Sequence, residues 1–192
     1  SVLAPGVFAA GRRATSARVF TAWLARTGRS TSDAGALLAS PKAHRELPAA
    51  LTQAEMRAVL ATALEALGDD GPQGLRDLAI LELLYATGIR VGELTNIDIV
   101  DLDTGRRLVR VFGKGRKERS VPYGVPAADA LGLWLERGRP SMARATSGAA
   151  AFLGARGGRI DQRAVRRIVH DRLGAVEGGP DLGPHGLRHT AA

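Results

Sequence analysis

Hydrophobic and polar positions follow a helical period over most of this chain, beginning with residues 12–26. In that segment Val19 and Trp23 fall on one face, whereas arginines occupy other positions. Residues 40–50 contain two prolines and show no periodicity, which is typical of an extended interdomain linker. A single amphipathic helix cannot bury its apolar stripe alone. We therefore predict that residues 1–39 end one helical domain and that residues 51–192 belong to a second.

The second domain is predicted to begin with a capped helix. Thr52 and Glu55 have the spacing of a capping box, and Leu51 and Met56 have that of a hydrophobic staple. Residues 75–86 are strongly apolar and are expected to lie in the core. The predicted elements are helices over 52–67, 75–86, 90–96 and 126–137, strands over 97–100, 108–112 and 119–122, a helix capped by Asp161, and a last helix from Pro184.

These patterns predict an α+β fold that is mainly helical and carries one small antiparallel sheet. Residues 68–73, which are rich in Gly and Asp, are predicted to form a loop between the first two helices. In the helix capped by Asp161, apolar residues keep helical spacing and Arg163, Arg166 and Arg167 lie opposite them. Asp98, Asp101 and Asp103 have no calcium-loop spacing and are interpreted as solvated carboxylates.

Composition adds a candidate partner and excludes several classes of site. Lys and Arg number 27 and Asp and Glu 19, so the formal net charge is 27 − 19 = +8. This charge favours a polyanionic partner, although an arginine-rich composition also follows from a GC-rich genome. The absence of cysteine excludes disulfides, thiol nucleophiles and thiolate zinc sites within these residues. The apolar runs are too short to cross a membrane, so no membrane span is predicted.

Arg90 is the first candidate for phosphate chemistry. Attack on a phosphodiester builds negative charge on the non-bridging oxygens, which guanidinium groups bind through paired hydrogen bonds. Arg90 follows the apolar helix through the break Thr87-Gly88-Ile89, and Glu93 is placed three residues later to orient it. The alternative interpretation is a surface arginine with an ordinary helical ion pair.

The second candidate is the segment of residues 113–119, a turn between two predicted strands. Glycines on both sides of Lys114 let its ammonium project, either to donate a proton to a leaving oxygen or to hold a phosphate. Arg116, Lys117 and Arg119 add positive charge and are predicted DNA contacts, as are the three arginines opposite the apolar stripe. A charged hairpin tip that only maintains solubility is the alternative.

His185 and Arg188 form the third candidate. Residues three apart share one face of a helix, so these two side chains are expected to address the same ligand. Pro184 marks the beginning of that helix, where free backbone N–H groups favour an anion. A histidine of near-neutral pKa transfers protons in such a place.

Taken together, the three segments resemble the tyrosine recombinase (phage integrase) family, most closely its Xer type and within that type the XerC branch. The similar motifs are LLYATGIRVGEL at 83–94, VFGKGRKERSVP at 111–122 and PHGLRH at 184–189. The resemblance covers nearly the whole chain and implies a catalytic domain over 51–192, incomplete at its C-terminal end. Residues 1–39 are then the remnant of a core-binding (SAM-like) domain, with a linker over 40–50.

The resemblance implies site-specific DNA recombination through a 3′-phosphotyrosyl intermediate. In that scheme Arg90 and Arg188 bind the non-bridging oxygens, Lys114 protonates the leaving 5′-oxygen, and His185 assists proton transfer at the nucleophile. Neither a metal nor another cofactor is implied. The implied partners are a double-stranded recombination site and a sister XerD-type recombinase in a tetramer, in the cytoplasm, with a role in chromosome dimer resolution and thus in chromosome partition at cell division.

The nucleophile is the point where the sequence departs from the family. The family's nucleophilic tyrosine lies beyond the His-x-x-Arg helix, whereas the only tyrosines here are Tyr85 and Tyr123 and neither matches that position. We therefore expect this polypeptide alone to bind DNA weakly and not to cleave it. The alternative is a non-catalytic DNA-binding or regulatory protein on the same fold.

Overall fold

The computed structural model describes residues 5–38, 51–65, 67–113, 115 and 117–175. The predicted linker, Lys114, Arg116 and the last predicted helix with His185 and Arg188 lie outside the described residues. The chain divides into two compact units, one over Ser1–Leu47 and one over Pro48–Ala192, and each is described by itself.

The first unit contains the helix α1 (Pro5–Arg26) and the short 3-10 helix η1 (Ala34–Leu37). α1 begins earlier than the periodicity predicts. Asp33 caps η1, since its carboxylate accepts from the N–H of Gly35 (3.2 Å) and from the hydroxyl of Thr21 (2.6 Å). Large apolar side chains on α1 remain exposed, namely Val19, Phe20 and Trp23. The first unit by itself therefore does not bury Val19 and Trp23, the two residues of the predicted apolar stripe.

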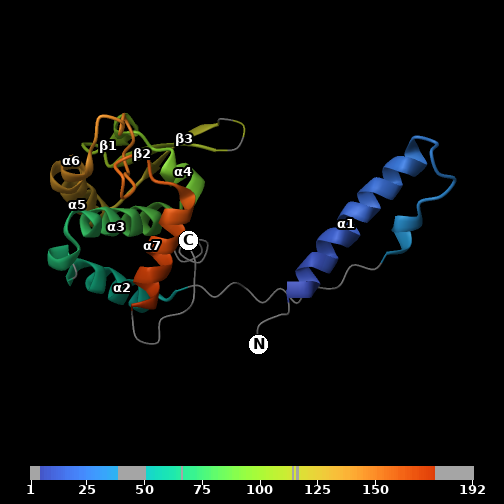
Figure 1. Cartoon of the computed structure of the whole chain (residues 1–192), viewed down its shortest axis with the longest axis horizontal. Coiled ribbons are helices and arrows are strands. Elements are labelled where there is room, and N and C mark those ends of the chain that lie inside the picture. Colours follow the sequence, from blue (N-terminus) through green and yellow to red (C-terminus); the bar gives the residue numbers. More distant parts are fainter. Residues whose placement is uncertain (1–4, 39–50, 66, 114, 116, 176–192) are drawn as a thin grey trace. The chain divides into compact units, whose positions relative to one another are not determined.

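The second unit is built mainly of helices, as predicted (Figure 1). Its helical elements are α2 (Gln53–Glu65), α3 (Leu67–Thr87), α4 (Val91–Thr95), η2 (Ile99–Asp101), α5 (Val125–Leu133), the π-helical η4 (Trp134–Gly138), α6 (Arg139–Met142) and α7 (Gln162–Gly174). α3 runs through the core and packs against α2 and α5. Trp134 is completely buried, stacks on Phe152 with ring centroids 6.5 Å apart, and donates to the carbonyl of Ala151.

The capping predictions are confirmed at α2. Glu55 accepts from the N–H of Thr52 at 2.6 Å, and the hydroxyl of Thr52 accepts from the N–H of Glu55 at 3.2 Å. The N–H of Thr52, and the Thr52 hydroxyl that donates to the same carboxylate at 2.8 Å, lower the pKa of Glu55. Leu51 and Met56 are both buried, as a staple requires.

The sheet has three antiparallel strands in the order β1-β2-β3. They are β1 (Leu102–Asp103), β2 (Leu108–Phe112) and β3 (Glu118–Pro122), so two of the three predicted strands are confirmed. The predicted strand over 97–100 is wrong, because η2 begins within it. The carboxylate of Asp101 accepts from the N–H of Asp98 (2.9 Å) and tightens the chain into that turn.

The residues of the predicted loop over 68–73 are mostly helical, since α3 already begins at Leu67. The helical conformation is interrupted at Gly71, whose φ of 55° and ψ of −141° are not helical. A positive φ is accessible to glycine at little cost, and Pro72 is accommodated in the first turn of the helical stretch that follows. The loop prediction is therefore wrong on both sides of Gly71, whereas the helix does break at the glycine itself.

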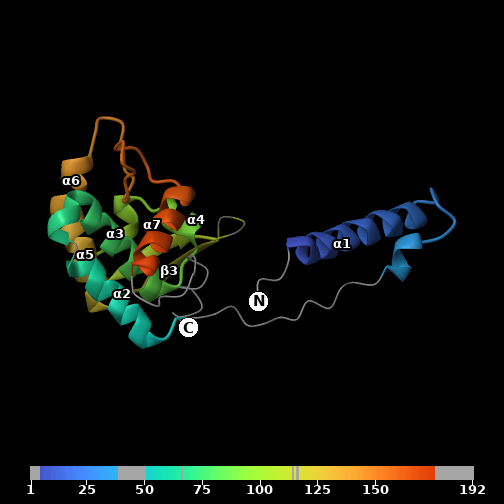
Figure 2. The ribbon, with the colours of Figure 1, turned by 60° about the horizontal axis from the view of Figure 1, so that its bottom comes forward.

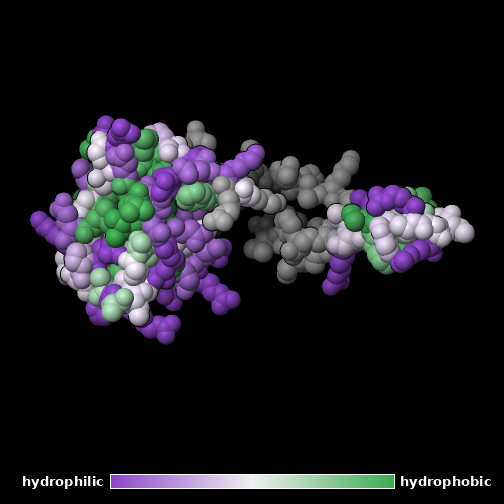
Figure 3. Space-filling model, turned by 90° about the horizontal axis from the view of Figure 1, so that it is seen from above, coloured by the Kyte–Doolittle hydropathy of each residue, from purple (hydrophilic) through white to green (hydrophobic). Residues whose placement is uncertain are grey.

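Figures 1 and 2 place α5 toward one side of this unit and α4 with the β3 hairpin toward the other. In the face of this unit drawn in Figure 3, hydrophilic side chains predominate, and hydrophobic side chains gather over parts of it. No helix among the described residues has the length and apolar character needed to cross a membrane.

Candidate functional site

Arg90 lies in the short connection between α3 and α4. Gly88 turns the chain after α3 with a φ of 58°, and Ile89 is buried in the core. Arg90 is extended and precedes the first turn of α4. Its side chain is 60% exposed, so a buried neighbour anchors the backbone while the guanidinium faces solvent. A cation held this way is available to an anionic ligand.

Glu93 orients Arg90, as its spacing predicts. Its carboxylate accepts from the backbone N–H of Arg90 at 2.7 Å and from the Arg90 Nη1 at 3.2 Å. This is half of a capping box, because an arginine side chain has no acceptor to return to the helix. The Glu93 side chain is only 5% exposed. A buried carboxylate thus ties the Arg90 backbone to α4.

Arg119 of β3 is the second cation on Glu93. Its Nη1 and Nη2 donate to the two carboxylate oxygens at 2.8 and 2.9 Å. Burial by itself would raise the pKa of Glu93, but the hydrogen bonds from Arg119 and from the Arg90 backbone outweigh it and lower the pKa to about 2. Glu93 is therefore ionised at neutral pH.

The hairpin between β2 and β3 is closed at its base by the N–H of Gly113, which donates to the carbonyl of Lys117 at 2.8 Å. Gly115 has a φ of 76°, which accounts for a glycine at the tip. Lys117 is exposed. The turn geometry agrees with the prediction, although Lys114 and Arg116 themselves are outside the described part.

α7 presents the three predicted arginines to solvent, since Arg163, Arg166 and Arg167 are all exposed and the apolar stripe is buried. Asp161 caps the helix by accepting from the N–H of Ala164 at 2.8 Å, and this bond lowers its pKa. A hollow of about 480 Å³ lies between the beginning of α7 and the end of α4. Its lining is polar or basic at most positions: Thr95, Asn96, Arg159, Ile160, Asp161, Gln162, Arg163 and Arg166.

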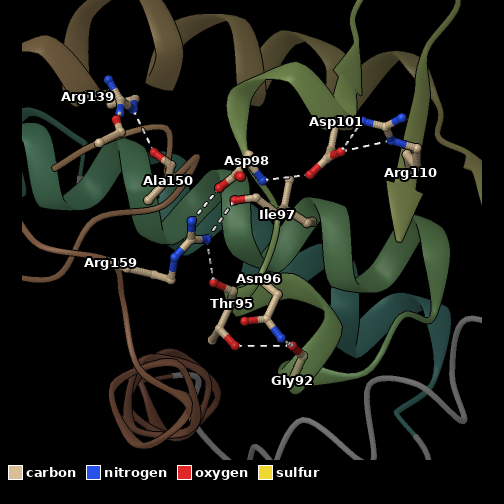
Figure 4. Close-up of polar contacts among 11 residues, drawn as sticks. Gly92, Thr95, Asn96, Ile97, Asp98, Asp101, Arg110, Arg139, Ala150 and Arg159 are labelled. Carbon is tan, nitrogen blue, oxygen red and sulfur yellow. Dashed lines mark hydrogen bonds and ion pairs between the residues drawn. The ribbon is translucent and has the colours of Figure 1, made fainter. Parts of the chain in front are cut away.

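Arg159, which the sequence did not single out, braces this region (Figure 4). Its Nη1 donates to the carbonyls of Thr95 (3.0 Å) and Ile97 (3.1 Å), and its Nη2 pairs with Asp98. Asp101 is likewise paired, with Arg110 of β2, and is buried. Interpreting Asp98 and Asp101 as solvated carboxylates is therefore wrong, since Asp98 pairs with Arg159, 61 positions away, and Asp101 pairs with Arg110, 9 positions away.

α7 is also fixed to α3 by ion pairs. Nη2 of Arg172 lies 2.6 Å from Asp70 and 3.2 Å from Asp77. Asp77 is buried and also pairs with Arg76, which donates to the carbonyl of Leu153. The exposed arginines of α7 consequently stand on a helix held rigidly against the core.

A second hollow, of about 330 Å³, lies among α2, α3 and α5 and has a different chemistry. Leu64, Leu78 and other apolar residues line it, together with Glu82 and Asp129. Burial raises the pKa of Glu82. Apolar walls and carboxylates do not suit a polyanion. The candidate site is therefore the basic side of the unit, which we define by Arg90, the hairpin between β2 and β3, and the exposed arginines of α7.

Neither tyrosine has the exposure expected of a nucleophile. Tyr123 is buried, its hydroxyl has no hydrogen-bond partner within the described part of the chain, and burial raises its pKa. Tyr85 is partly buried on α3 and packs against the core.

A family model and curated relatives assign this chain to the same family. The family model described as "Phage integrase family" matches residues 49–192. "Tyrosine recombinase XerC" of Mycobacterium sp. (strain KMS) is 54% identical over 181 residues, which are 94% of this chain and 60% of that protein. The protein of the same name from Mycobacterium tuberculosis (strain ATCC 25177 / H37Ra) is 53% identical over 94% of this chain and 61% of its own length. The chain thus spans about 60% of these relatives.

Solved structures agree in fold. A crystal structure of XerA recombinase is 28% identical, with a TM-score of 0.65 over 93% of this chain and 67% of that one. Lambda integrase residues 75–356 bound to DNA give a TM-score of 0.71 at 18% identity, over 97% of this chain and 64% of that one.

Proposed function

Because this chain belongs to the phage integrase family, we propose that it is part of a site-specific recombinase that cuts and rejoins DNA strands through a 3′-phosphotyrosyl intermediate. The observation that carries the proposal is Arg90, an exposed guanidinium fixed at its backbone by the buried Glu93. Such a group stabilises the charge that develops on phosphate oxygens during transesterification. The similarity to XerC proteins over 94% of the chain supports the same function.

The remaining catalytic roles follow the family motifs. Arg188 is the second phosphate-binding guanidinium, Lys114 protonates the leaving 5′-oxygen, and His185 assists proton transfer at the nucleophile. Their positions in the sequence match the family motifs in order. The nucleophile is a tyrosine outside residues 1–192, because the two tyrosines within it are partly or fully buried.

DNA contacts are proposed along the basic side of the second unit. Arg163, Arg166 and Arg167 on α7 and Lys117 on the hairpin are exposed cations, and Arg116 has the same role. Guanidinium and ammonium groups of this kind bind backbone phosphates and position a protein on its site. Arg119, predicted for the same role, is held by Glu93 and is considered separately below.

The finer biological role is inferred from the XerC resemblance. We propose chromosome dimer resolution in the cytoplasm, within a tetramer that includes a sister XerD-type recombinase and spans two DNA sites. The test mixes the full-length protein with a duplex carrying the recombination site. A protein–DNA complex that forms only when the second recombinase is added would identify that recombinase as the partner.

A covalent adduct is the test of the enzymatic proposal. The full-length protein encoded by the gene is incubated with a nicked duplex carrying a site selected by binding from random DNA. A protein–DNA adduct resistant to denaturant is expected, and Arg90→Ala is expected to abolish it while leaving the thermal midpoint within a few degrees, because its guanidinium is exposed. Binding of that site without any adduct would instead support a non-catalytic DNA-binding protein.

The role of Lys114 is tested with an altered leaving group. Lys114→Ala slows cleavage of an ordinary duplex, and a 5′-phosphorothiolate substrate, whose leaving group needs no proton, restores the rate if Lys114 is the acid. Without that rescue, Lys114 only binds phosphate.

A further inference from the structure

Arg119 has an unusual place for a charged residue in a strand. It pairs with Val111 across β2 and β3, and directly opposite residues share a face of the sheet. Val111 is buried, and Val121, two residues along β3, packs against the core on the same face. The Arg119 side chain nevertheless remains 41% exposed, so it is not buried with the core residues of that face. Arg119 meets Glu93, 26 positions earlier in the chain.

The contacts divide unequally between the two arginines. Glu93 receives two hydrogen bonds of 2.8 and 2.9 Å from the Arg119 guanidinium, but only one, of 3.2 Å, from the Arg90 guanidinium. The Arg119 pair is bidentate, which is the strongest arrangement for an arginine with a carboxylate. Arg119 therefore supplies the neutralising charge, and Arg90 is bound mainly through its backbone N–H.

Removing Arg119 would change what Arg90 does. The buried Glu93 would retain one cation, Arg90, and would draw that guanidinium toward itself and away from solvent. A phosphate approaching Arg90 would also meet an uncompensated carboxylate. The Arg119 guanidinium also borders the hairpin, since a Cβ at Gly113 would lie 3.5 Å from its Nη1. Arg119 thus links the Arg90 turn to the residue that precedes Lys114.

We propose that Arg119 is a positioning residue for strand cleavage: by neutralising Glu93 it leaves the Arg90 guanidinium free to bind the scissile phosphate. The proposal rests on the proposed recombinase function. It differs from direct DNA binding by Arg119, because it makes the effect of Arg119 depend on the charge of Glu93.

The test is a double-mutant cycle in the full-length protein, with single-turnover cleavage of the nicked duplex and DNA affinity measured in parallel. Arg119→Gln is expected to slow cleavage by about 10-fold or more, and to change affinity by less than about 3-fold. Adding Glu93→Gln removes the charge that needs neutralising, so the double variant is expected to cleave faster than Arg119→Gln alone, although below the unsubstituted rate because Glu93 also holds the Arg90 backbone. Arg119→Lys retains the charge without the bidentate contact, so its cleavage rate is expected to lie between that of Arg119→Gln and that of the unsubstituted protein.

Arg110 provides a matched control. It lies on β2, its side chain is 41% exposed like that of Arg119, and it makes two hydrogen-bond-length contacts with the buried Asp101, at 2.9 and 2.7 Å. Arg110→Gln therefore removes a comparable ion pair from the same sheet without touching Glu93. It is expected to lower the thermal midpoint without the loss of cleavage seen in Arg119→Gln.

Three outcomes would overturn the inference while the proposed function stands. Cleavage by Arg119→Gln at the unsubstituted rate shows that Arg119 does not position Arg90. A double variant no faster than Arg119→Gln assigns Arg119 to DNA binding or to structure alone. Equal slowing by Arg110→Gln shows a general loss of stability. If the unsubstituted protein itself forms no adduct, the proposed function fails, and this inference fails with it.

Discussion

At the scale of single residues, Glu93 contacts one arginine that is close to it in the sequence, Arg90, and one that is distant, Arg119. Its distance of three positions from Arg90 predicts the interaction between them, and the hydrogen bonds confirm it. Arg119 was interpreted from its neighbours in sequence as a DNA contact, and nothing in the segment 113–119 indicates a buried carboxylate as its partner. The partner is supplied by another element, so only folding reveals it.

The low pKa of Glu93 makes a prediction about acid stability. Its pKa is about 2 in the folded protein against an ordinary value of 4.5, so the ionised group stabilises the fold fully above pH 4.5. That contribution is lost as the pH falls from 4.5 toward 2. The free energy of unfolding of Glu93→Gln, measured by denaturant titration, should therefore fall below that of the unsubstituted protein at pH 7, by a difference that shrinks across this window.

Glu136 is the control for the substitution itself. It is exposed, and its side chain makes no ion pair or hydrogen bond with the described residues. Glu136→Gln should therefore change the free energy of unfolding at pH 7 much less than Glu93→Gln does. A Glu93→Gln difference that stays constant between pH 7 and pH 3 would contradict the assigned ion pair.

At the scale of elements, two glycines in neighbouring helical turns respond oppositely to the same substitution. A Cβ at Gly138 in η4 would lie 2.5 Å from a ring carbon of the buried Trp134 and 3.1 Å from Leu75, so Gly138→Ala should destabilise the protein by about 1–3 kcal/mol. A Cβ at Gly132 in α5 meets nothing within 4 Å, so Gly132→Ala should stabilise it by about 0.5–1 kcal/mol. Equilibrium denaturation measures the change in the free energy of unfolding for both variants. A change of the same sign in both would contradict the packing assigned to η4.

The errors in predicted elements lie where the local signal allows two conformations. Gly71 interrupts the helical conformation at one residue, but the residues predicted as loop on both sides of it are helical. The segment 97–100 has apolar residues suited to a strand, yet the carboxylate of Asp101 accepts from the nearby N–H of Asp98, and the N–H of Ile99 donates to the carbonyl of Ala149. The contact with Ala149 comes from a segment distant in the sequence, so the residues around 97–100 do not show it.

At the scale of the whole molecule, the arginines of α7 predict a salt dependence. Replacing Arg163, Arg166 and Arg167 by Gln should weaken DNA binding and reduce the slope of log affinity against log salt by about 0.9 for each lost phosphate contact. The control removes the same charge elsewhere, with Arg106, Arg137 and Arg156 replaced by Gln. Fluorescence anisotropy over a salt series measures both. Equal loss of slope in the two variants would show general attraction to DNA rather than an interface on α7.

Features that depend on near neighbours could be predicted from the residues alone: the capping box at Thr52, the buried face of α3, the exposed arginines of α7 and the spacing of Arg90 and Glu93. Helical and strand periods and caps act within a few residues, so they can be seen in one segment at a time. Only the tertiary structure decided that Glu93 pairs with Arg119, that Asp101 pairs with Arg110, and that Arg159 braces the chain between α4 and η2. Those contacts join segments up to 64 positions apart, and their partners are chosen by how the core closes rather than by any pattern along the chain.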